Sequence, residues 1–128
     1  LYIIGMMNTA DRSLAILDYA LRRRFAFFDM KPGFDSDGFC EYRKKLGNKK
    51  FDKLIAAVEN LNRVISADES LGEGFCIGHS YFCNLEHVSD QILQDIVEYE
   101  LIPLLKEYWF DEPLKVQEWM NKLRSVLQ

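Results

Sequence analysis

Polar and charged side chains that can contact a phosphate gather between Asn8 and Arg24. A run of apolar residues, Leu-Tyr-Ile-Ile-Gly-Met-Met, ends directly before the sequence Asn8-Thr9-Ala10-Asp11. In open α/β sheets, ligands bind beyond the carboxyl ends of the strands. A nucleotide bound at such an end would meet this polar cluster, where an asparagine can orient a water molecule or touch a γ-phosphate.

Three consecutive arginines close the helix-like segment that follows. Basic residues in the last turn of a helix complement its dipole by about 0.3–1 kcal/mol each, so a helix-end or solvated role is the plain interpretation, and a DNA-contacting patch is an alternative. If the helix persists to residue 24, Arg23 points outward, where it can reach a neighbouring subunit. Arg24 then leans toward the apolar face and needs an anion such as Asp11 or a phosphate. Arg22 lies four residues after Asp18, which favours an ion pair.

The elements that must position these residues divide the chain into two parts. The apolar runs at residues 1–7 and 25–30 predict buried strands, and leucines at helical spacing predict a helix over residues 13–23 between them. Beyond Pro32, the hydrophobic pattern has the period of amphipathic helices. These helices are predicted at residues 35–46 (closed by Gly47), at 50–67, from 88 to about 104 with a bend at Pro103, and after Asp111 as a cap with Pro113 in the first turn.

Composition and charge limit the classes of protein to which the chain can belong. Its 128 residues are 48% hydrophobic and 28% charged, which is typical of one globular domain. The formal net charge of −4 argues against a general electrostatic nucleic-acid binder, although it leaves room for local basic clusters. No signal peptide or apolar run approaching 18 residues is visible, so we expect no membrane association.

The cysteines and the start of the chain add two expectations. The three cysteines form no CxxC pair, which predicts reduced, non-catalytic thiols and a cytoplasmic location. The chain begins inside an apolar, strand-like run. We therefore expect it to be a piece of a larger protein.

A second block of interest is the sequence GFCIGHSYF at residues 74–82. His79 and Ser80 have no third partner and no G-x-S-x-G elbow, which argues against a hydrolase. Cys76, His79 and Cys83 lack a fourth ligand at zinc spacing, so no metal site is predicted. Two interpretations of the block stay open, a packed turn and a contact with nucleotide.

Three stretches of the chain resemble one family. MNTADRSLAILDYALRRRF is similar to the segment that follows the Walker B strand in AAA+ proteins of the McrB family, the GTP-hydrolysing motor subunits of modified-cytosine-dependent restriction systems. GFCIGHSYF resembles the lid-domain signature of that family, and IPLLKEYWFDEP…WMNKL resembles its C-terminus. The resemblance covers essentially the whole chain.

The resemblance implies a fold and a role for each part. Residues 1–32 would be the sensor 1 strand–helix–strand piece of an AAA+ sheet, and residues 33–128 the helical lid over the nucleotide. Asn8 would be the sensor residue, within an NTxD motif that includes Thr9 and Asp11. Asp18, Arg23 and Arg24 match positions that serve catalysis across the subunit interface, including the arginine finger. The lid residues that would lie near the nucleotide are Gly78, His79 and Ser80.

The resemblance also implies what surrounds the chain. The full-length protein would hydrolyse GTP, or ATP, with Mg²⁺, assemble into a ring, and work with an McrC-like nuclease subunit and with DNA through an upstream domain. The printed sequence has no G-x-x-x-x-G-K-[ST] and no acidic Walker B strand, and we expect both upstream of Leu1. The fragment alone is therefore expected to be inactive and to hold no cofactor tightly. The alternatives are the lid portion of a MoxR-like remodelling ATPase and a non-enzymatic helical interaction module.

Overall fold

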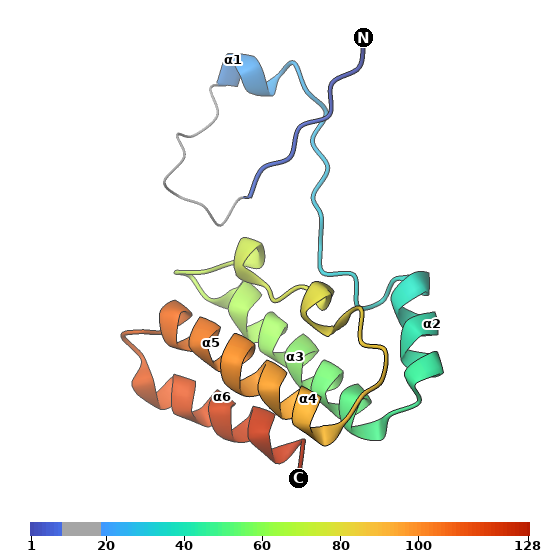
Figure 1. Cartoon of the computed structure of the whole chain (residues 1–128). Helices are drawn as coiled ribbons and strands as arrows, with labels where there is room; N and C mark the ends of the chain where they lie inside the picture. The colour runs from blue at the N-terminus through green and yellow to red at the C-terminus, as the bar shows by residue number, and fades with distance from the viewer. Residues whose placement is uncertain (9–18) are drawn as a thin grey trace.

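The described residues of the computed structural model, 1–8 and 19–128, form a helical body with an extended N-terminal segment (Figure 1). The α-helices are α1 (Tyr19–Arg22), α2 (Asp37–Leu46), α3 (Lys49–Ala67), α4 (Asp90–Ile96), α5 (Ile102–Tyr108) and α6 (Pro113–Ser125). Short 3₁₀ turns lie at Glu73–Phe75 and His79–Phe82, and a π-helical turn, Val97–Leu101, joins α4 to α5. The predicted helical character of the chain after Pro32 is confirmed.

Local capping signals define where α2 and α3 begin and end. The Ser36 hydroxyl accepts a hydrogen bond from the backbone N–H of Phe39, and the Asn48 side chain accepts one from Phe51. Gly47 ends α2 in the left-handed conformation, with φ of 55°, which glycine adopts without steric cost. The helices predicted at 35–46 and 50–67 are thus confirmed to within two residues.

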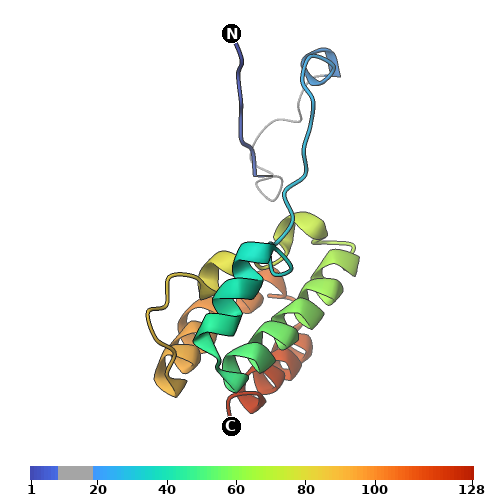
Figure 2. The same ribbon diagram turned by 90° about the vertical axis from the view of Figure 1, so that its right-hand side faces the viewer.

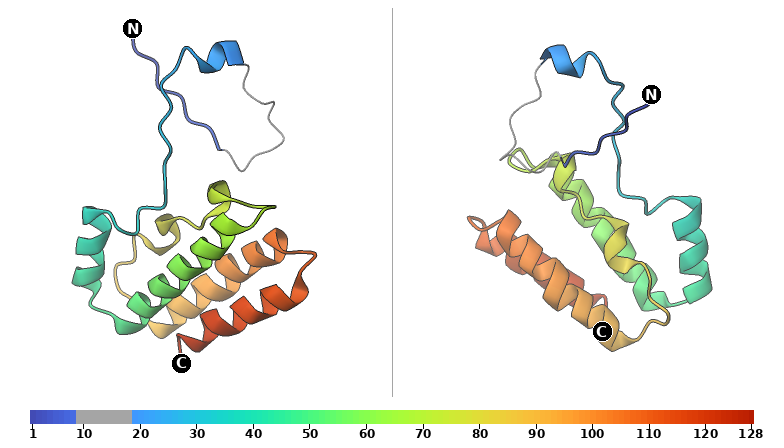
Figure 3. Two further views of the ribbon diagram at one scale, coloured as in Figure 1. Left: turned by 180° about the vertical axis from the view of Figure 1, so that it is seen from behind. Right: turned by 45° about the horizontal axis from the view of Figure 1, so that its top comes forward.

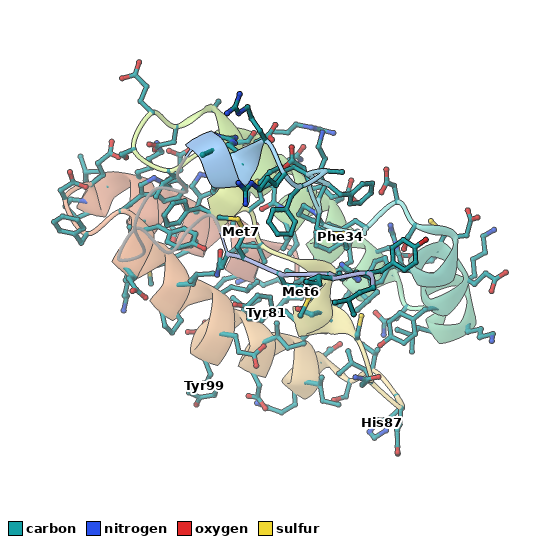
Figure 4. All side chains as sticks on the ribbon, turned by 90° about the horizontal axis from the view of Figure 1, so that it is seen from above. Met6, Met7, Phe34, Tyr81, His87 and Tyr99 are labelled. Carbon is teal, nitrogen blue, oxygen red and sulfur yellow. The ribbon has the colours of Figure 1, made fainter. Side chains whose placement is uncertain are left out.

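A π-helical turn, Val97–Leu101, precedes Pro103, where the sequence predicts a bend. A proline ring clashes with the carbonyl four residues earlier and removes one hydrogen-bond donor. The N–H of Ile102 bonds instead to the carbonyl of Val97, five residues back, which widens the helix just before the proline. Tyr99, in this turn, points out from the edge of the body and is 76% exposed (Figure 4).

One sequence prediction about α6 is wrong. Glu112, not Asp111, occupies the N-cap position, and its side chain makes no capping hydrogen bond. Pro113 lies in the first turn as predicted. The backbone N–H groups of a first turn have no partner inside the helix, so the N–H that proline lacks costs no hydrogen bond there. The fixed proline backbone therefore begins this helix without a side-chain cap.

A single apolar core lies between three helical stretches: α3, the continuous run of α4, the π-helical turn and α5, and α6. The helix α2 and the segment 71–89 cover one side of this core (Figure 3). Large side chains in the core are fully shielded from water, including Trp109, Phe51 and Phe82. The other members come from every helix after α1. The helical body therefore has its own core.

The strands predicted at residues 1–7 and 25–30 are absent from the described part of the chain. Both stretches are extended but unpaired, and they run away from the helical body (Figure 2). Ile4 is 93% exposed and Phe28 is 85% exposed. A strand needs hydrogen bonds from a neighbour and an apolar cover, and the residues that the structure describes supply neither to these two stretches.

Asp68 ties the end of α3 to the connection between α5 and α6. Its carboxylate accepts hydrogen bonds from the Trp109 indole (2.9 Å), from the backbone and hydroxyl of Ser70 (2.9 and 2.7 Å) and from Lys115 (3.3 Å). Bonds from Ser70 and Trp109 hold the pKa of this carboxyl well below its ordinary value of 3.8. The charged form is thus the one that the fold stabilises.

We expect Asp68→Asn to lower the free energy of unfolding at neutral pH by about 1.5–3 kcal/mol, because its hydrogen bonds involve a charged group. A carboxyl whose pKa is lowered by folding stabilises the protein above its unfolded pKa and loses that contribution as pH falls. The wild-type chain should therefore lose stability steeply below about pH 4, and the variant less steeply. Urea unfolding over a pH series measures both curves, and parallel curves would contradict this role for Asp68.

Candidate functional site

Most of the predicted phosphate-contacting cluster lies outside the described residues. Thr9, Asp11 and Asp18 fall in the stretch 9–18, of which the structure gives no description. Asn8 is exposed at the end of the first described segment. The roles predicted for these four residues stay predictions.

The three arginines do not share one helix. The α1 helix ends at Arg22, and Arg23 and Arg24 lie in the turn that follows. The prediction of their directions assumed a helix that persists to residue 24, so that geometry is wrong. The Arg22 guanidinium lies 5.6 Å from the centre of the Phe27 ring, a cation–π contact. Arg23 and Arg24 are exposed.

The GFCIGHSYF block, in contrast, is firmly held against α3. The Asn62 side chain accepts a hydrogen bond from the N–H of Ile77 (2.6 Å) and donates one to the carbonyl of the same residue (2.9 Å). One amide thereby satisfies both backbone groups of Ile77, whose side chain is 1% exposed. This contact fixes the position of the chain immediately before Gly78.

A second clamp comes from α2. The Tyr42 hydroxyl donates to the carbonyl of Phe82 (2.8 Å) and accepts from the N–H of Leu85 (3.1 Å). The Phe82 ring packs against Phe34 and Phe51, at centroid distances of 6.1 and 6.3 Å. The block thus ends in a buried aromatic side chain with its backbone held in place.

His79 joins the block to Gly33, which precedes the first helix of the helical body. Its Nδ1 accepts a hydrogen bond of 2.9 Å from the N–H of Gly33, so the ring is unprotonated at that nitrogen. Its ring also contacts Phe34 and Phe39 edge to face, at 6.2 and 5.7 Å. These contacts support the packed-turn interpretation of the block.

The neighbours of His79 in the block differ in exposure. Ser80 is exposed, and Gly78 precedes the 3₁₀ turn in an extended conformation. The structure therefore brings His79 of this block against Gly33, where the extended N-terminal segment meets the helical body. Contact of Gly78, His79 or Ser80 with a nucleotide stays a prediction. The other histidine, His87, lies on the outer edge of the body (Figure 4).

The cysteine thiols are used as hydrogen-bond donors. The Cys83 thiol donates to the carbonyl of His79 (3.3 Å), and the Cys76 thiol to the carbonyl of Asn62 (3.5 Å). Burial, with the nearby charge of Glu73, raises the pKa of Cys76 and disfavours its thiolate. Within residues 1–8 and 19–128, no three His, Cys, Asp or Glu side chains are grouped closely enough to hold a metal ion.

The Gly33–His79 contact leaves no room for a larger residue. A Cβ at Gly33 would lie 2.8 Å from Cε1 of His79. We expect Gly33→Ala to destabilise the helical body by about 1–3 kcal/mol, because the ring of His79 must move and lose its hydrogen bond. In a His79→Ala background the same change should cost far less, since the obstructing ring is gone. A double-mutant cycle by urea unfolding checks this coupling, and additive effects would contradict it.

Comparison with known proteins gives two matches. A family described as McrB, alpha-helical lid domain, matches residues 53–117, which run from early α3 into α6. The chain is also 51% identical over 129 residues to the "Type IV methyl-directed restriction enzyme EcoKMcrB subunit" of Escherichia coli (strain K12). That alignment covers 95% of this chain and 28% of the relative, so the chain spans less than a third of the relative's length.

None of the helices in the described residues has the length and apolar character needed to cross a membrane.

Proposed function

The chain belongs to the McrB lid-domain family, and from this premise we propose that it is the C-terminal part of an AAA+ motor subunit that hydrolyses GTP, or ATP, in a modified-cytosine-dependent DNA restriction system. The observation that carries the proposal is the 51% identity to a restriction-enzyme subunit over nearly the whole chain. The all-helical lid over residues 33–128 agrees with it, because the family match falls inside that body.

The N-terminal segment belongs, in this proposal, to the nucleotide-binding sheet of the longer protein. Exposed apolar residues in both of its extended stretches support this, since Ile4, Phe27 and Phe28 have no cover in the helical body. Strands from the rest of the protein would pair with residues 1–7 and 25–30. The segment would then place Asn8 at the carboxyl end of a strand.

The proposed roles divide between two subunits of a ring. Asn8, Thr9 and Asp11 would face the phosphates bound by their own subunit, with Asn8 orienting the attacking water. Asp18, Arg23 and Arg24 would act on the nucleotide of the adjacent subunit. Exposure of Arg23 and Arg24 in a turn, rather than along a helix, is compatible with contact across an interface. The lid would support the arginine segment through the Gly33–His79 junction.

The reaction is phosphoryl transfer to water, which depends on positioning and on stabilising negative charge. Mg²⁺, when bound, neutralises charge on the β- and γ-phosphate oxygens. The phosphate-binding loop and the magnesium ligands would lie on residues outside this chain. The isolated 128-residue chain is therefore expected to hydrolyse no nucleotide and to bind none tightly.

The full assembly would contain a ring of these subunits, an McrC-like nuclease subunit and DNA held by an upstream domain, in the cytoplasm. A MoxR-like remodelling ATPase would share the ring but not the nuclease partner. A non-enzymatic helical module would share neither. The family match favours the first proposal over both alternatives.

Hydrolysis by the full-length protein tests the proposal. We expect turnover of GTP, or of ATP, and association with a nuclease subunit. Hydrolysis of ATP alone, with no nuclease subunit bound, would favour the remodelling ATPase. No hydrolysis of either nucleotide by the assembled protein would refute the enzymatic proposal.

A further inference from the structure

The proposed roles leave unexplained a concentration of positive charge where α2 meets α3. Six of the chain's 16 lysines and arginines fall within the 11 residues 43–53, alongside one acidic residue, Asp52. The chain as a whole carries a net charge of −4. We name this surface the basic corner; its members are Arg43, Lys44, Lys45, Lys49, Lys50 and Lys53.

The fold gathers these side chains at one place. The left-handed Gly47 and the cap residue Asn48 reverse the chain, so the end of α2 adjoins the start of α3. A shallow depression of about 310 Å³ opens there, lined by Cys40, Arg43, Lys44, Gly47 and Asp52. Figure 1 shows this corner at the opposite end of α2 from the extended N-terminal segment. The corner therefore faces away from the region where the nucleotide-binding sheet would attach.

Only part of this charge is neutralised within the lid. Arg43 pairs with Asp52 at 3.1 Å, and Lys50 pairs with Asp90 at 2.8 Å. The other four members, all exposed, have no carboxylate partner within the described residues: Lys44, Lys45, Lys49 and Lys53.

Folding accounts for only part of the basic corner. Arg43, Lys44 and Lys45 lie in the last turn of α2, where cations complement the helix dipole. Lys49 and Lys50 occupy the first turn of α3, near the positive end of the helix dipole, where a cation is unfavourable. They also repel the lysines at the end of α2. Such an arrangement becomes favourable when a polyanion binds, because bound negative charge offsets both effects.

The chemistry of the corner fits a phosphate backbone rather than nucleobases. Lysine ammonium groups act as mobile point charges, whereas base recognition uses bidentate or stacking side chains. The one aromatic residue between 43 and 53, Phe51, is fully buried and unavailable for stacking. We propose that the basic corner contacts the phosphates of duplex DNA without reading its sequence; this rests on the proposed function, which supplies DNA as the polyanion.

The test uses the full-length assembled protein and unmodified duplex DNA, with affinity measured over a series of salt concentrations. The variant carries Lys44→Gln, Lys45→Gln and Lys49→Gln. The control removes equal charge from exposed positions elsewhere, by Arg63→Gln, Lys106→Gln and Lys122→Gln. Each phosphate contact contributes about 0.9 to the slope of log affinity against log salt. We expect the slope of the variant to be smaller by about 2–3 and that of the control to be unchanged.

Other results of these measurements would contradict a DNA contact at the basic corner. Equal slopes for the wild type and the variant would overturn the proposal. Loss of ring assembly or of nuclease binding, with an unchanged salt slope, would also overturn it and assign the corner to an acidic protein surface. Basal nucleotide hydrolysis, measured without DNA, should be the same in all three proteins. Its absence from the wild type would refute the proposed function, while the DNA slopes would still decide the role of the corner.

Discussion

Arg23→Ala in the full-length protein is expected to lower nucleotide hydrolysis by about 10³–10⁵-fold and to leave nucleotide binding nearly unchanged. This corresponds to about 4–7 kcal/mol of transition-state stabilisation. The reason is that an arginine supplied by a neighbouring subunit meets charge that develops only during phosphoryl transfer. Steady-state hydrolysis of the assembled variant, beside equilibrium nucleotide binding, measures the two effects separately.

Arg22 supplies the matched control for this prediction. Its guanidinium already lies over Phe27 in the same segment, and no catalytic role is proposed for it. Arg22→Ala should therefore keep most of the activity. Near-normal turnover by an assembled Arg23→Ala variant would rule out Arg23 as the catalytic arginine. A loss shared equally by both variants would point to a structural effect on the segment.

Phe82→Ala is expected to destabilise the lid by about 3–5 kcal/mol. The ring is 0% exposed and packs between Phe34 and Phe51, so truncation leaves a cavity at the point where the 71–89 segment is anchored. That loss is a large fraction of the about 5–15 kcal/mol by which a native domain is stable. Urea unfolding of the 128-residue chain, followed by helical circular dichroism, measures it.

The adjacent residue provides the comparison. Tyr81 is 36% exposed, and Tyr81→Ala should cost about 1 kcal/mol or less. Similar losses for the two variants would show that the block is not anchored through Phe82. A small loss for Phe82→Ala alone would contradict the packed-turn interpretation of residues 74–82.

The sequence predicted the lid well because its signals are local. The helix over 50–67 follows from the period of its apolar residues, and its start coincides with the Asn48 cap. The left-handed Gly47 similarly closes the helix before it. Such features depend on residues three or four apart, which a single sequence displays directly.

The predictions that failed depend on contacts with other parts of the protein, and the spacing of apolar residues in the sequence does not reveal such contacts. The apolar runs at 1–7 and 25–30 predict strands, but a strand requires a partner, and the described part of the chain places none beside them. Of the helix predicted over 13–23, residues 13–18 lie outside the described part of the chain, and α1 ends at Arg22, one residue before the predicted end. The directions predicted for Arg23 and Arg24 required a helix that persists to residue 24, so they do not apply. Asp111 is a favourable cap by residue type, yet the proline at position 113 starts the helix after Glu112.

The contacts that hold the GFCIGHSYF block were also not predicted, since they join residues far apart in the chain. Asn62 reaches Ile77, 15 residues away, and Tyr42 reaches Phe82, 40 away. Gly33 and His79 are 46 apart. A polar residue inside an amphipathic helix, as Asn62 is, was the one available signal, and it does not identify its partner.

Mixing two inactive variants of the full-length protein tests the central claim most directly. One carries Arg23→Ala, and the other has the lysine of its phosphate-binding loop replaced. If Arg23 acts on the nucleotide of the adjacent subunit, mixed rings pair an intact phosphate-binding loop with an intact arginine, and hydrolysis is restored to a substantial part of the wild-type rate. If the mixture stays as inactive as each variant alone while mixed rings form, Arg23 does not act across the subunit interface.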